Sequence, residues 1–208
     1  MKYLRADHSA SKLQPMSAAP VINHISVEDY LSGEPLSEVR HEYIAGQVSA
    51  MAGASRNHNF VAGQCYATLL AHLSGTPCRP YIGDVKVRLL VNQKDIFYYP
   101  DVVVGCDPRD THDHYLKFPK LIIEVLSEST QRLDRLEKFS NYITLDSLEE
   151  YVLLAQDKPE VTLFRRRTGW SQEIYSGLDA RIILESVDLT ISLAEIYQNV
   201  TVAAQQPL

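Results

Sequence analysis

Residues 96–105 read IFYYPDVVVG and residues 121–130 read LIIEVLSEST, and these two stretches decide the fold. Each contains a run of β-branched and large apolar residues, which predicts a strand buried on both faces. Each also contains one acid that interrupts the apolar pattern, Asp101 in the first and Glu124 in the second. Burying an unpartnered carboxylate is strongly unfavourable, so we expect each acid to pair with a cation, bind a metal or lie at an open end of a sheet.

The neighbouring patterns predict a mixed sheet with helices packed on it. Alternation of apolar and polar residues predicts a half-buried strand, and a continuous apolar run predicts a strand buried on both faces. Apolar residues spaced three and four apart predict a helix. The predicted strands are 81–90, 96–105, 121–126, 151–155, 161–166 and 172–175, with a hairpin turned at Ala45-Gly46. The predicted helices are 26–33, 57–75, 130–143 and 193–198. This order indicates an α/β or mixed α+β fold with a mixed central β-sheet around one core.

Length and composition limit the domain organisation and the class of protein. With 208 residues and 45% hydrophobic residues, the chain is expected to form one globular domain at 26–200, between flexible tails at 1–25 and 201–208. A net charge of −6 argues against a protein that binds nucleic acid over its whole surface, and it is compatible with a local basic patch. The chain has neither an apolar run of membrane-spanning length nor a secretory signal, so we expect a cytoplasmic protein without a membrane partner.

The three cysteines do not suggest a disulfide or a metal site. Cys65, Cys78 and Cys106 are odd in number, widely spaced and without a CxxC pair. This pattern predicts neither a disulfide framework nor a zinc knuckle, and it favours a reducing compartment. Cys65 is expected in the core, and none of the three has the neighbourhood of a catalytic nucleophile.

The two interrupting acids point to metal chemistry if their strands are neighbours. Carboxylates on adjacent strands, about 4.8 Å apart, can meet at one ion, and the backbone carbonyl of Val125 can add a third oxygen. An all-oxygen site favours Mg²⁺ or Mn²⁺ over zinc. Lys138 follows Asp134 by four residues on the predicted helix, so it can reach the sheet end and act on a water molecule or a phosphate. This combination indicates phosphodiester hydrolysis.

Each of these residues also has an ordinary structural interpretation. Asp101 can cap a turn after a proline, and Glu124 can form a salt bridge with Arg88 or Lys86. Lys138 can form a solvated ion pair within its own helix. A glutamate such as Glu42 is more often a surface strand residue, and a histidine such as His58 is more often an ordinary first-turn helix residue than a ligand.

Two further groups of polar residues have compositions that could bind a metal or a phosphate, but their patterns favour structural roles. Asp110, His112, Asp113 and His114 resemble a zinc site in composition, but the segment is typical of a polar loop. The run 165–167 is three arginines that can touch phosphates, although a basic run at a strand end is more often solvent-facing.

The motifs resemble the Uma-two (Uma2) family, a group of unknown function in the PD-(D/E)XK restriction-endonuclease-like superfamily. The resemblance rests on YPDVVV at 99–104, LIIEVLSEST at 121–130, the spaced Asp134, Lys138 and Tyr142, the stretch EYIAG at 42–46, and His58 after the small residues 53–55. It extends from about Val27 to Tyr197. It implies a restriction-endonuclease-like core, a DNA substrate and a homodimer.

The resemblance also implies roles for individual residues in a metal-dependent DNA endonuclease. Asp101 and Glu124, with the Val125 carbonyl, would bind Mg²⁺ or Mn²⁺, and Glu42 would be an accessory acid. The superfamily lysine normally stands two residues after the second acid, where this chain has Leu126. Lys138 would therefore be a migrated lysine, delivered from the following helix.

One departure from the family pattern supports a different function. The acids that the family carries beside the Gly46 turn are Ala45 and Gln47 here. Together with the acidic balance, this favours an alternative hypothesis, a catalytically inactive nuclease-fold protein that binds DNA or regulates. A third hypothesis is a dimeric interaction protein with neither activity.

Overall fold

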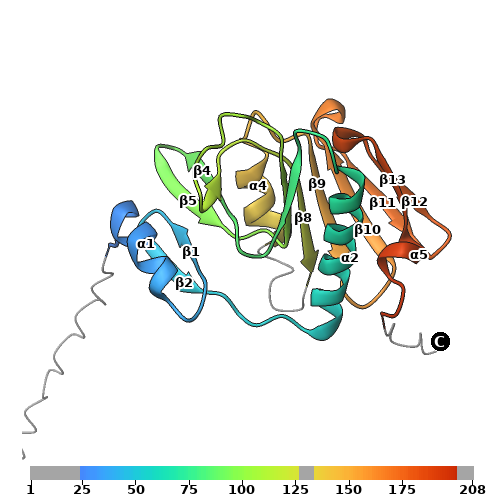
Figure 1. Cartoon of the computed structure of the whole chain (residues 1–208), viewed down its shortest axis with the longest axis horizontal. Helices are drawn as coiled ribbons and strands as arrows, with labels where there is room; N and C mark the ends of the chain where they lie inside the picture. Colours follow the sequence, from blue (N-terminus) through green and yellow to red (C-terminus); the bar gives the residue numbers. More distant parts are fainter. Residues whose placement is uncertain (1–23, 127–133, 201–208) are drawn as a thin grey trace, which may run out of the picture.

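The computed structural model describes residues 24–126 and 134–200, and these form a mixed α+β fold (Figure 1). A six-stranded sheet has the order β11-β10-β9-β8-β6-β3, and a five-stranded sheet has the order β2-β1-β5-β4-β7. The six-stranded sheet contains β3 (Arg79–Ile82), β6 (Val102–Gly105), β8 (Pro119–Leu126), β9 (Glu150–Ala155), β10 (Glu160–Arg165) and β11 (Gln172–Ser176). The five-stranded sheet contains β1 (His41–Ile44), β2 (Gln47–Ala50), β4 (Lys86–Val91), β5 (Lys94–Tyr98) and β7 (Tyr115–Leu116).

The remaining elements are short, apart from one helix. The α-helices are α1 (Val27–Gly33), α2 (Arg56–His72), α4 (Phe139–Tyr142) and α5 (Leu193–Ile196). A two-stranded sheet pairs β12 (Arg181–Leu184) with β13 (Leu189–Ser192). The helical turns are η1 (Glu34–Leu36), the π-helical η2 (Asp134–Lys138), η3 (Arg166–Thr168) and η4 (Glu185–Val187).

Strand β8 is the centre of the fold, and its two neighbours show that the sheet is mixed. It pairs with β9 in parallel and with β6 in antiparallel orientation. All its residues except Lys120 are buried, as its nearly continuous apolar sequence predicts. The sequence-based expectation of a mixed central sheet flanked by helices is therefore confirmed.

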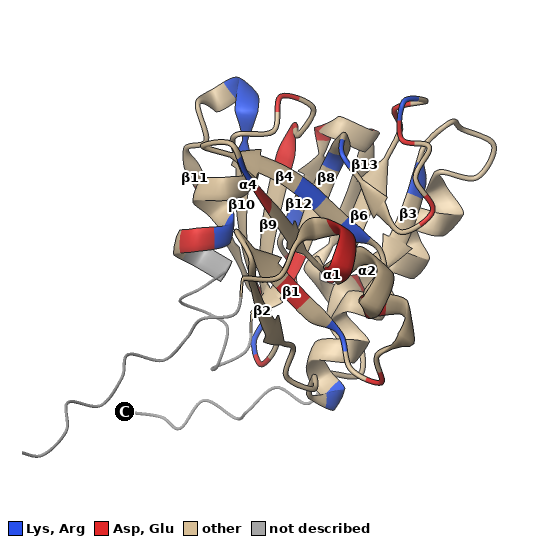
Figure 2. Cartoon of the chain, turned by 90° about the vertical axis from the view of Figure 1, so that its left-hand side faces the viewer, with Lys and Arg blue, Asp and Glu red and all other residues tan. Residues whose placement is uncertain are grey.

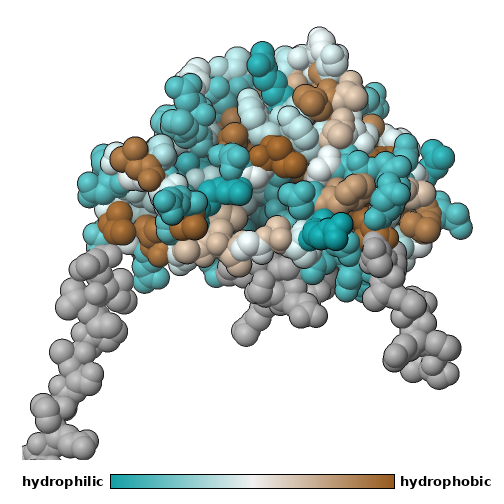
Figure 3. All heavy atoms as spheres, turned by 60° about the horizontal axis from the view of Figure 1, so that its bottom comes forward, coloured by the Kyte–Doolittle hydropathy of each residue, from teal (hydrophilic) through white to brown (hydrophobic). Residues whose placement is uncertain are grey.

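Two hydrophobic cores lie on opposite faces of the six-stranded sheet. On one face, apolar side chains of β8, β9 and β10 pack with α2, α5 and the β12–β13 pair. On the other face, the sheet packs with the five-stranded sheet and α4. Figure 1 shows α2 across one face and the α1, β1 and β2 region at the far end of the molecule from β12 and β13. The face shown in Figure 3 carries its apolar residues in separate groups among polar ones.

Two predicted strands are each divided between the sheets. The predicted strand 81–90 is broken at Gly83, which has a φ of +66°, so β3 and β4 lie in different sheets. The predicted strand 96–105 is divided into β5 and β6 around Pro100, which has no N–H to donate to a ladder. Asp101 therefore lies where the chain crosses from one sheet to the other.

The predicted helices differ from the structure at their ends. Helix α2 begins after Ser55, not Asn57, because the Ser55 hydroxyl accepts the His58 backbone N–H at 3.1 Å. In the predicted helix 130–143, residues 130–133 lie outside the described residues, and the described part is a π-helical turn followed by α4. The sequence analysis did not predict β12 and β13, whose four-residue strands give too short an alternation to stand out.

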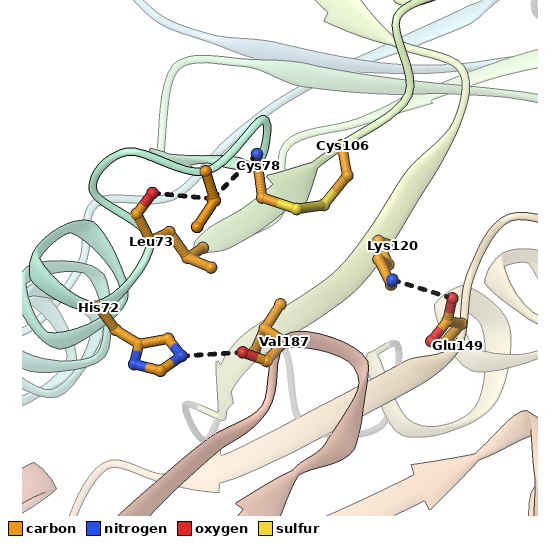
Figure 4. The surroundings of a disulfide bond; sticks show 8 residues. His72, Leu73, Cys78, Cys106, Lys120, Glu149 and Val187 are labelled. Atoms are coloured by element: carbon orange, nitrogen blue, oxygen red, sulfur yellow. Dashed lines mark hydrogen bonds and ion pairs between the residues drawn. A yellow bond between two sulfur atoms is a disulfide. The ribbon is translucent and has the colours of Figure 1, made fainter.

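The prediction that the cysteines form no disulfide is wrong, because Cys78 and Cys106 are bonded (Figure 4). Strands β3 and β6 pair with Arg79 opposite Gly105. Continuing that register by one residue places Cys78 opposite Cys106, and their Cα atoms are 4.1 Å apart. Strand register therefore joins two cysteines that are 28 residues apart in sequence. Cys65 is a free, buried thiol.

None of the helices in the described ranges is long and apolar enough to cross a membrane.

Candidate active site

All five residues that the sequence analysis selected line one pocket. The pocket has a volume of about 760 Å³. Its walls include Glu42, Asp101, Glu124, Val125 and Lys138. These residues come from β1, the crossover before β6, β8 and η2, so four segments remote in sequence meet at one place.

Asp101 and Glu124 lie on the same face of the six-stranded sheet. Strands β6 and β8 pair with Val102 opposite Ile123, and extending this register by one residue places Asp101 opposite Glu124. Directly opposed residues of an antiparallel pair project from the same face. That face is the one covered by the five-stranded sheet, from which Glu42 approaches.

The Asp101 carboxylate is oriented by two contacts to one of its oxygens. Its Oδ2 accepts the Val125 backbone N–H at 2.7 Å and lies 3.2 Å from His58 Nε2. The N–H and C=O of a strand residue point toward the same neighbouring strand. The Val125 carbonyl therefore faces the side on which Asp101 lies, next to the second acid.

Glu124 is buried and has a cationic partner, which is not one of the two expected strand residues. The Lys138 Nζ lies 3.5 Å from Glu124 Oε1, and the Tyr142 hydroxyl donates to the same oxygen at 3.4 Å. The expected alternatives are engaged elsewhere: Arg88 pairs with an aspartate on β5, and the Lys86 amine donates to a tyrosine hydroxyl. The salt-bridge interpretation of Glu124 thus held for the kind of contact but not for the partner.

Lys138 is a buried residue, not the solvated helix residue of the simplest interpretation. It is only 5% exposed. Its amine lies 2.9 Å from Glu42 Oε1 and 5.4 Å from the centre of the Tyr98 ring. It ends the π-helical turn η2, a type of turn that recurs at functional sites because it alters the direction of side chains. The side chain of Asp134, its expected partner, lies outside the described part of the structure.

Glu42 is also more enclosed than a surface strand residue. Its side chain is 12% exposed. Its Oε1 accepts the backbone N–H of Tyr99 at 3.3 Å, in addition to its contact with Lys138. Glu42 therefore links the five-stranded sheet to the lysine and to the segment that precedes Asp101.

A second group of polar residues supports the pocket, and sequence analysis missed it. The Glu34 carboxylate accepts the His41 backbone N–H at 2.6 Å and the Tyr99 hydroxyl at 3.0 Å. Lys86, 4% exposed, donates to the same tyrosine oxygen at 3.1 Å. Burial raises the pKa of Tyr99 and lowers the pKa of Lys86. The sequence feature that could have indicated a role for this group is the position of Tyr99 directly before Pro100-Asp101.

The pocket is acidic, and the charges around it are mixed. Among the described residues, its lining contains six carboxylates, those of Glu34, Glu38, Glu42, Asp84, Asp101 and Glu124. Arg40 and Lys138 are the lysine and arginine residues of that described lining. Figure 2 shows Lys and Arg interspersed with Asp and Glu on the side that it presents. A phosphodiester entering this pocket therefore requires additional positive charge.

The hard oxygens of the pocket fit a Mg²⁺-type ion, although the side chains are not arranged as a closed cage. Two carboxylates and a backbone carbonyl on one face are the ligand chemistry that Mg²⁺ and Mn²⁺ prefer. Within the described ranges, no three or more His, Cys, Asp and Glu side chains are grouped to hold a metal ion. The Lys138 amine stands between Glu42 and Glu124 instead.

The rival histidine-rich segment has structural contacts of its own. The Asp110 carboxylate accepts the backbone N–H groups of Lys117 and Phe118, at 2.6 and 3.1 Å. The His112 ring stacks on Tyr115 with centroids 3.8 Å apart. These contacts close a loop, in agreement with the structural interpretation.

The three arginines of 165–167 are engaged within the fold. Arg165 is buried and pairs with Glu150 at 3.0 Å, and Arg166 donates to the Leu148 carbonyl at 2.8 Å. Arg167 pairs with Glu185. The prediction of a solvent-facing run is therefore wrong for Arg165, which is buried, and holds for Arg167, whose side chain is 62% exposed.

Comparisons with known proteins agree on one family. Residues 27–194 match the Uma2 family model, described as "Putative restriction endonuclease". The chain is 33% identical over 177 residues to the uncharacterized protein slr1290 of Synechocystis sp., covering 84% of this chain and 92% of that protein. It is 31% identical over 135 residues to the uncharacterized protein sll1609 of the same organism, covering 64% of this chain and 75% of that protein.

The fold is also similar to that of a solved structure. That structure, from Anabaena variabilis ATCC 29413, is described as "a putative nuclease belonging to DUF820". The TM-score is 0.69 at 17% identity, covering 83% of this chain and 97% of the other. Because the identity is low, this likeness establishes the fold alone. The family match extends over most of the chain, and the chain therefore belongs to the Uma2 family of restriction-endonuclease-like proteins.

Proposed function

We propose that the protein is a Mg²⁺- or Mn²⁺-dependent endonuclease that hydrolyses phosphodiester bonds in DNA. The observation that carries the proposal is the meeting of Asp101, Glu124 and Lys138, from three separate segments, in one pocket. Two acids on one sheet face supply ligands for a hard cation, and a buried ammonium supplies a group for a phosphate. Membership of a restriction-endonuclease-like family supports the same reaction class.

The proposed ligands are the Asp101 and Glu124 carboxylates and the Val125 carbonyl. A divalent ion held there would stabilise negative charge on the scissile phosphate and activate a water molecule. The contacts of Asp101 Oδ2 with Val125 and His58 fix the orientation of that carboxylate. Such fixed orientation lowers the cost of assembling the site.

Lys138 is proposed to bind the phosphate or to assist the attacking water. Its amine is largely shielded from water, so its interaction with developing negative charge is stronger than at an exposed surface. Glu42 holds the amine at 2.9 Å, and this contact positions the end of a long, flexible side chain. Glu42 thereby contributes to the reaction as an accessory acid.

The proposal is tested by cleavage of plasmid DNA. Wild-type protein with Mg²⁺ or Mn²⁺ is expected to nick or cut the DNA, and EDTA is expected to stop the reaction. Glu124→Gln and Asp101→Asn are expected to abolish cleavage while circular dichroism shows an unchanged fold. Glu149→Gln is the matched control, because Glu149 is a half-exposed acid that pairs with Lys120 outside this pocket. Equal cleavage by wild type and Glu124→Gln would overturn the assignment.

A second candidate function is DNA binding without hydrolysis. The observation that favours it is the presence of Ala45 and Gln47 at positions where the family carries acids. In that case the wild type would retain DNA in the presence of EDTA and would not cleave it with any divalent ion. Gel-shift and cleavage assays on the same DNA separate the two functions.

A further inference from the structure

The Lys138 amine occupies the space between two acids of the pocket. It lies 2.9 Å from Glu42 Oε1 and 3.5 Å from Glu124 Oε1. The side chains of all three residues are 12% exposed or less. Three enclosed charges at these distances interact strongly, because little water screens them. The ammonium of Lys138 therefore compensates the negative charge of the two carboxylates.

The other cation of the pocket wall cannot take over this role. Arg40 lies at the rim, with a side chain that is 50% exposed. It pairs with Asp84 at 3.2 Å and donates to the Gly83 carbonyl at 2.7 Å. Among the described residues that line the pocket, Lys138 is thus the only buried lysine or arginine.

We infer that Lys138 is a resident counter-cation that makes the binding of a divalent ion and of a phosphodiester cooperative. This inference rests on the proposed function, since it assumes an ion site at Asp101 and Glu124. An ion that binds Glu124 must compete with an ammonium already 3.5 Å from that carboxylate. A phosphate that attracts the ammonium removes this competition, so DNA strengthens ion binding. By thermodynamic linkage the ion strengthens DNA binding by the same factor.

The distances from Lys138 to the two glutamates show which of these two ion pairs breaks first. The distance to Glu42 is the shorter one, and Glu42 is also fixed by the Tyr99 N–H. Glu124 has a further donor, the Tyr142 hydroxyl, and it stays buried when the amine moves. The amine can therefore leave Glu124 while Glu42 retains it. Glu42 keeps the lysine within reach of a bound phosphate.

The test measures Mn²⁺ binding by isothermal titration calorimetry, without turnover. The full chain is titrated alone and with a short phosphorothioate duplex that resists hydrolysis. Lys138→Met is expected to bind Mn²⁺ at least about tenfold more tightly than wild type in the absence of DNA. The duplex is expected to tighten Mn²⁺ binding several-fold more in wild type than in Lys138→Met, where the direct attraction between phosphate and ion remains. Lys120→Met, at a lysine paired with Glu149 elsewhere, is expected to behave as wild type.

The outcomes separate failure of the inference from failure of the proposed function. Equal or weaker Mn²⁺ binding by Lys138→Met, or the same effect of DNA in both proteins, overturns the inference. Glu124→Gln distinguishes failure of the inference from failure of the proposed metal site. If Glu124→Gln binds Mn²⁺ as tightly as wild type does, the proposed metal site is wrong and the inference fails with it. If Lys138→Met does not fold, Lys138→Gln provides the same comparison, with folding checked by circular dichroism.

Discussion

At the residue scale, one oxygen of Asp101 receives two contacts while the carboxylate faces the pocket. The convergence of Asp101, Glu124 and Lys138 could be expected from the sequence, because the two acids interrupt apolar runs and the family motif links them to the lysine. The contacts of His58, Glu34 and Tyr99 could not be expected, because they depend on how two sheets pack. A sequence pattern reports the spacing of side chains within one helix or strand. These contacts join side chains from different helices and strands, so no such pattern reveals them.

The His58 contact leads to a prediction about activity. Removing the imidazole leaves Asp101 with the Val125 N–H as its other donor at Oδ2. Hydrogen bonds to charged groups contribute about 1.5–3 kcal/mol, so His58→Ala is expected to lower kcat/KM for DNA cleavage by about 10- to 100-fold. His58→Gln, which retains a donor, should recover part of the activity. His72→Ala is the control, since His72 contacts Val187 near the other end of α2, and equal losses in both variants would contradict this role.

At the element scale, strand register explains what the sequence analysis missed. The sequence of 81–90 alternates as one strand does, yet Gly83 and the crossover divide it between two sheets. The same pairing of β3 with β6 brings Cys78 opposite Cys106. Pairings between distant strands are non-local, so neither residue spacing nor cysteine counting reveals them.

The disulfide leads to a prediction about stability and thiol reactivity. Closing a loop between cysteines 28 residues apart contributes about 3.6 kcal/mol to the free energy of unfolding in the chain-entropy description. Urea unfolding with and without dithiothreitol should show a loss of about that size, and Cys78→Ser/Cys106→Ser should show the same loss without reductant.

The remaining cysteine provides an independent check on that bond. Burial raises the pKa of Cys65 to about 12, so its thiol is expected to be unreactive toward Ellman's reagent in the folded protein at neutral pH. After unfolding without reductant, one thiol per chain should react. Three reactive thiols in that sample would show that the disulfide does not form.

The hairpin that carries Glu42 leads to a prediction at the same scale. Gly46 turns β1 into β2 with a φ of +93°, and a Cβ there would clash with the His24 ring. Gly46→Ala is therefore expected to destabilise the fold by about 1–3 kcal/mol in urea unfolding. Gly63→Ala in α2 is the matched control, because a Cβ there meets nothing within 4 Å, and it should stabilise by about 0.5–1 kcal/mol. Equal effects of the two changes would contradict the role of the turn.

At the scale of the whole molecule, the two-core architecture places tyrosines in the interior. Tyr98 and Tyr142 are fully buried between the two sheets, and burial raises the pKa of both hydroxyls. The sequence predicted a mixed sheet around one core. It did not predict the second sheet, because the strands that form it continue directly into strands of the first.

The buried tyrosines lead to a prediction about pH. A raised pKa in the folded state means that the unfolded chain loses its tyrosine protons first, near the ordinary pKa of 10.0. The stabilisation is fully present below that pH and is lost as the pH rises above it. Urea unfolding across this range is expected to show a steady decline in the free energy of unfolding, with a shallower decline for Tyr142→Phe. An unchanged decline in that variant would contradict the contribution of Tyr142.

The proposed activity depends on a divalent ion in the acidic pocket, and locating that ion in a crystal is its most direct test. Crystals grown with Mn²⁺ and measured for anomalous scattering are expected to show one strong peak within coordination distance of Asp101, Glu124 and the Val125 carbonyl oxygen. The Lys138 amine is expected to have left Glu124 and to remain beside Glu42. A pocket without an anomalous peak at saturating Mn²⁺, with Lys138 still bridging both glutamates, would contradict the account.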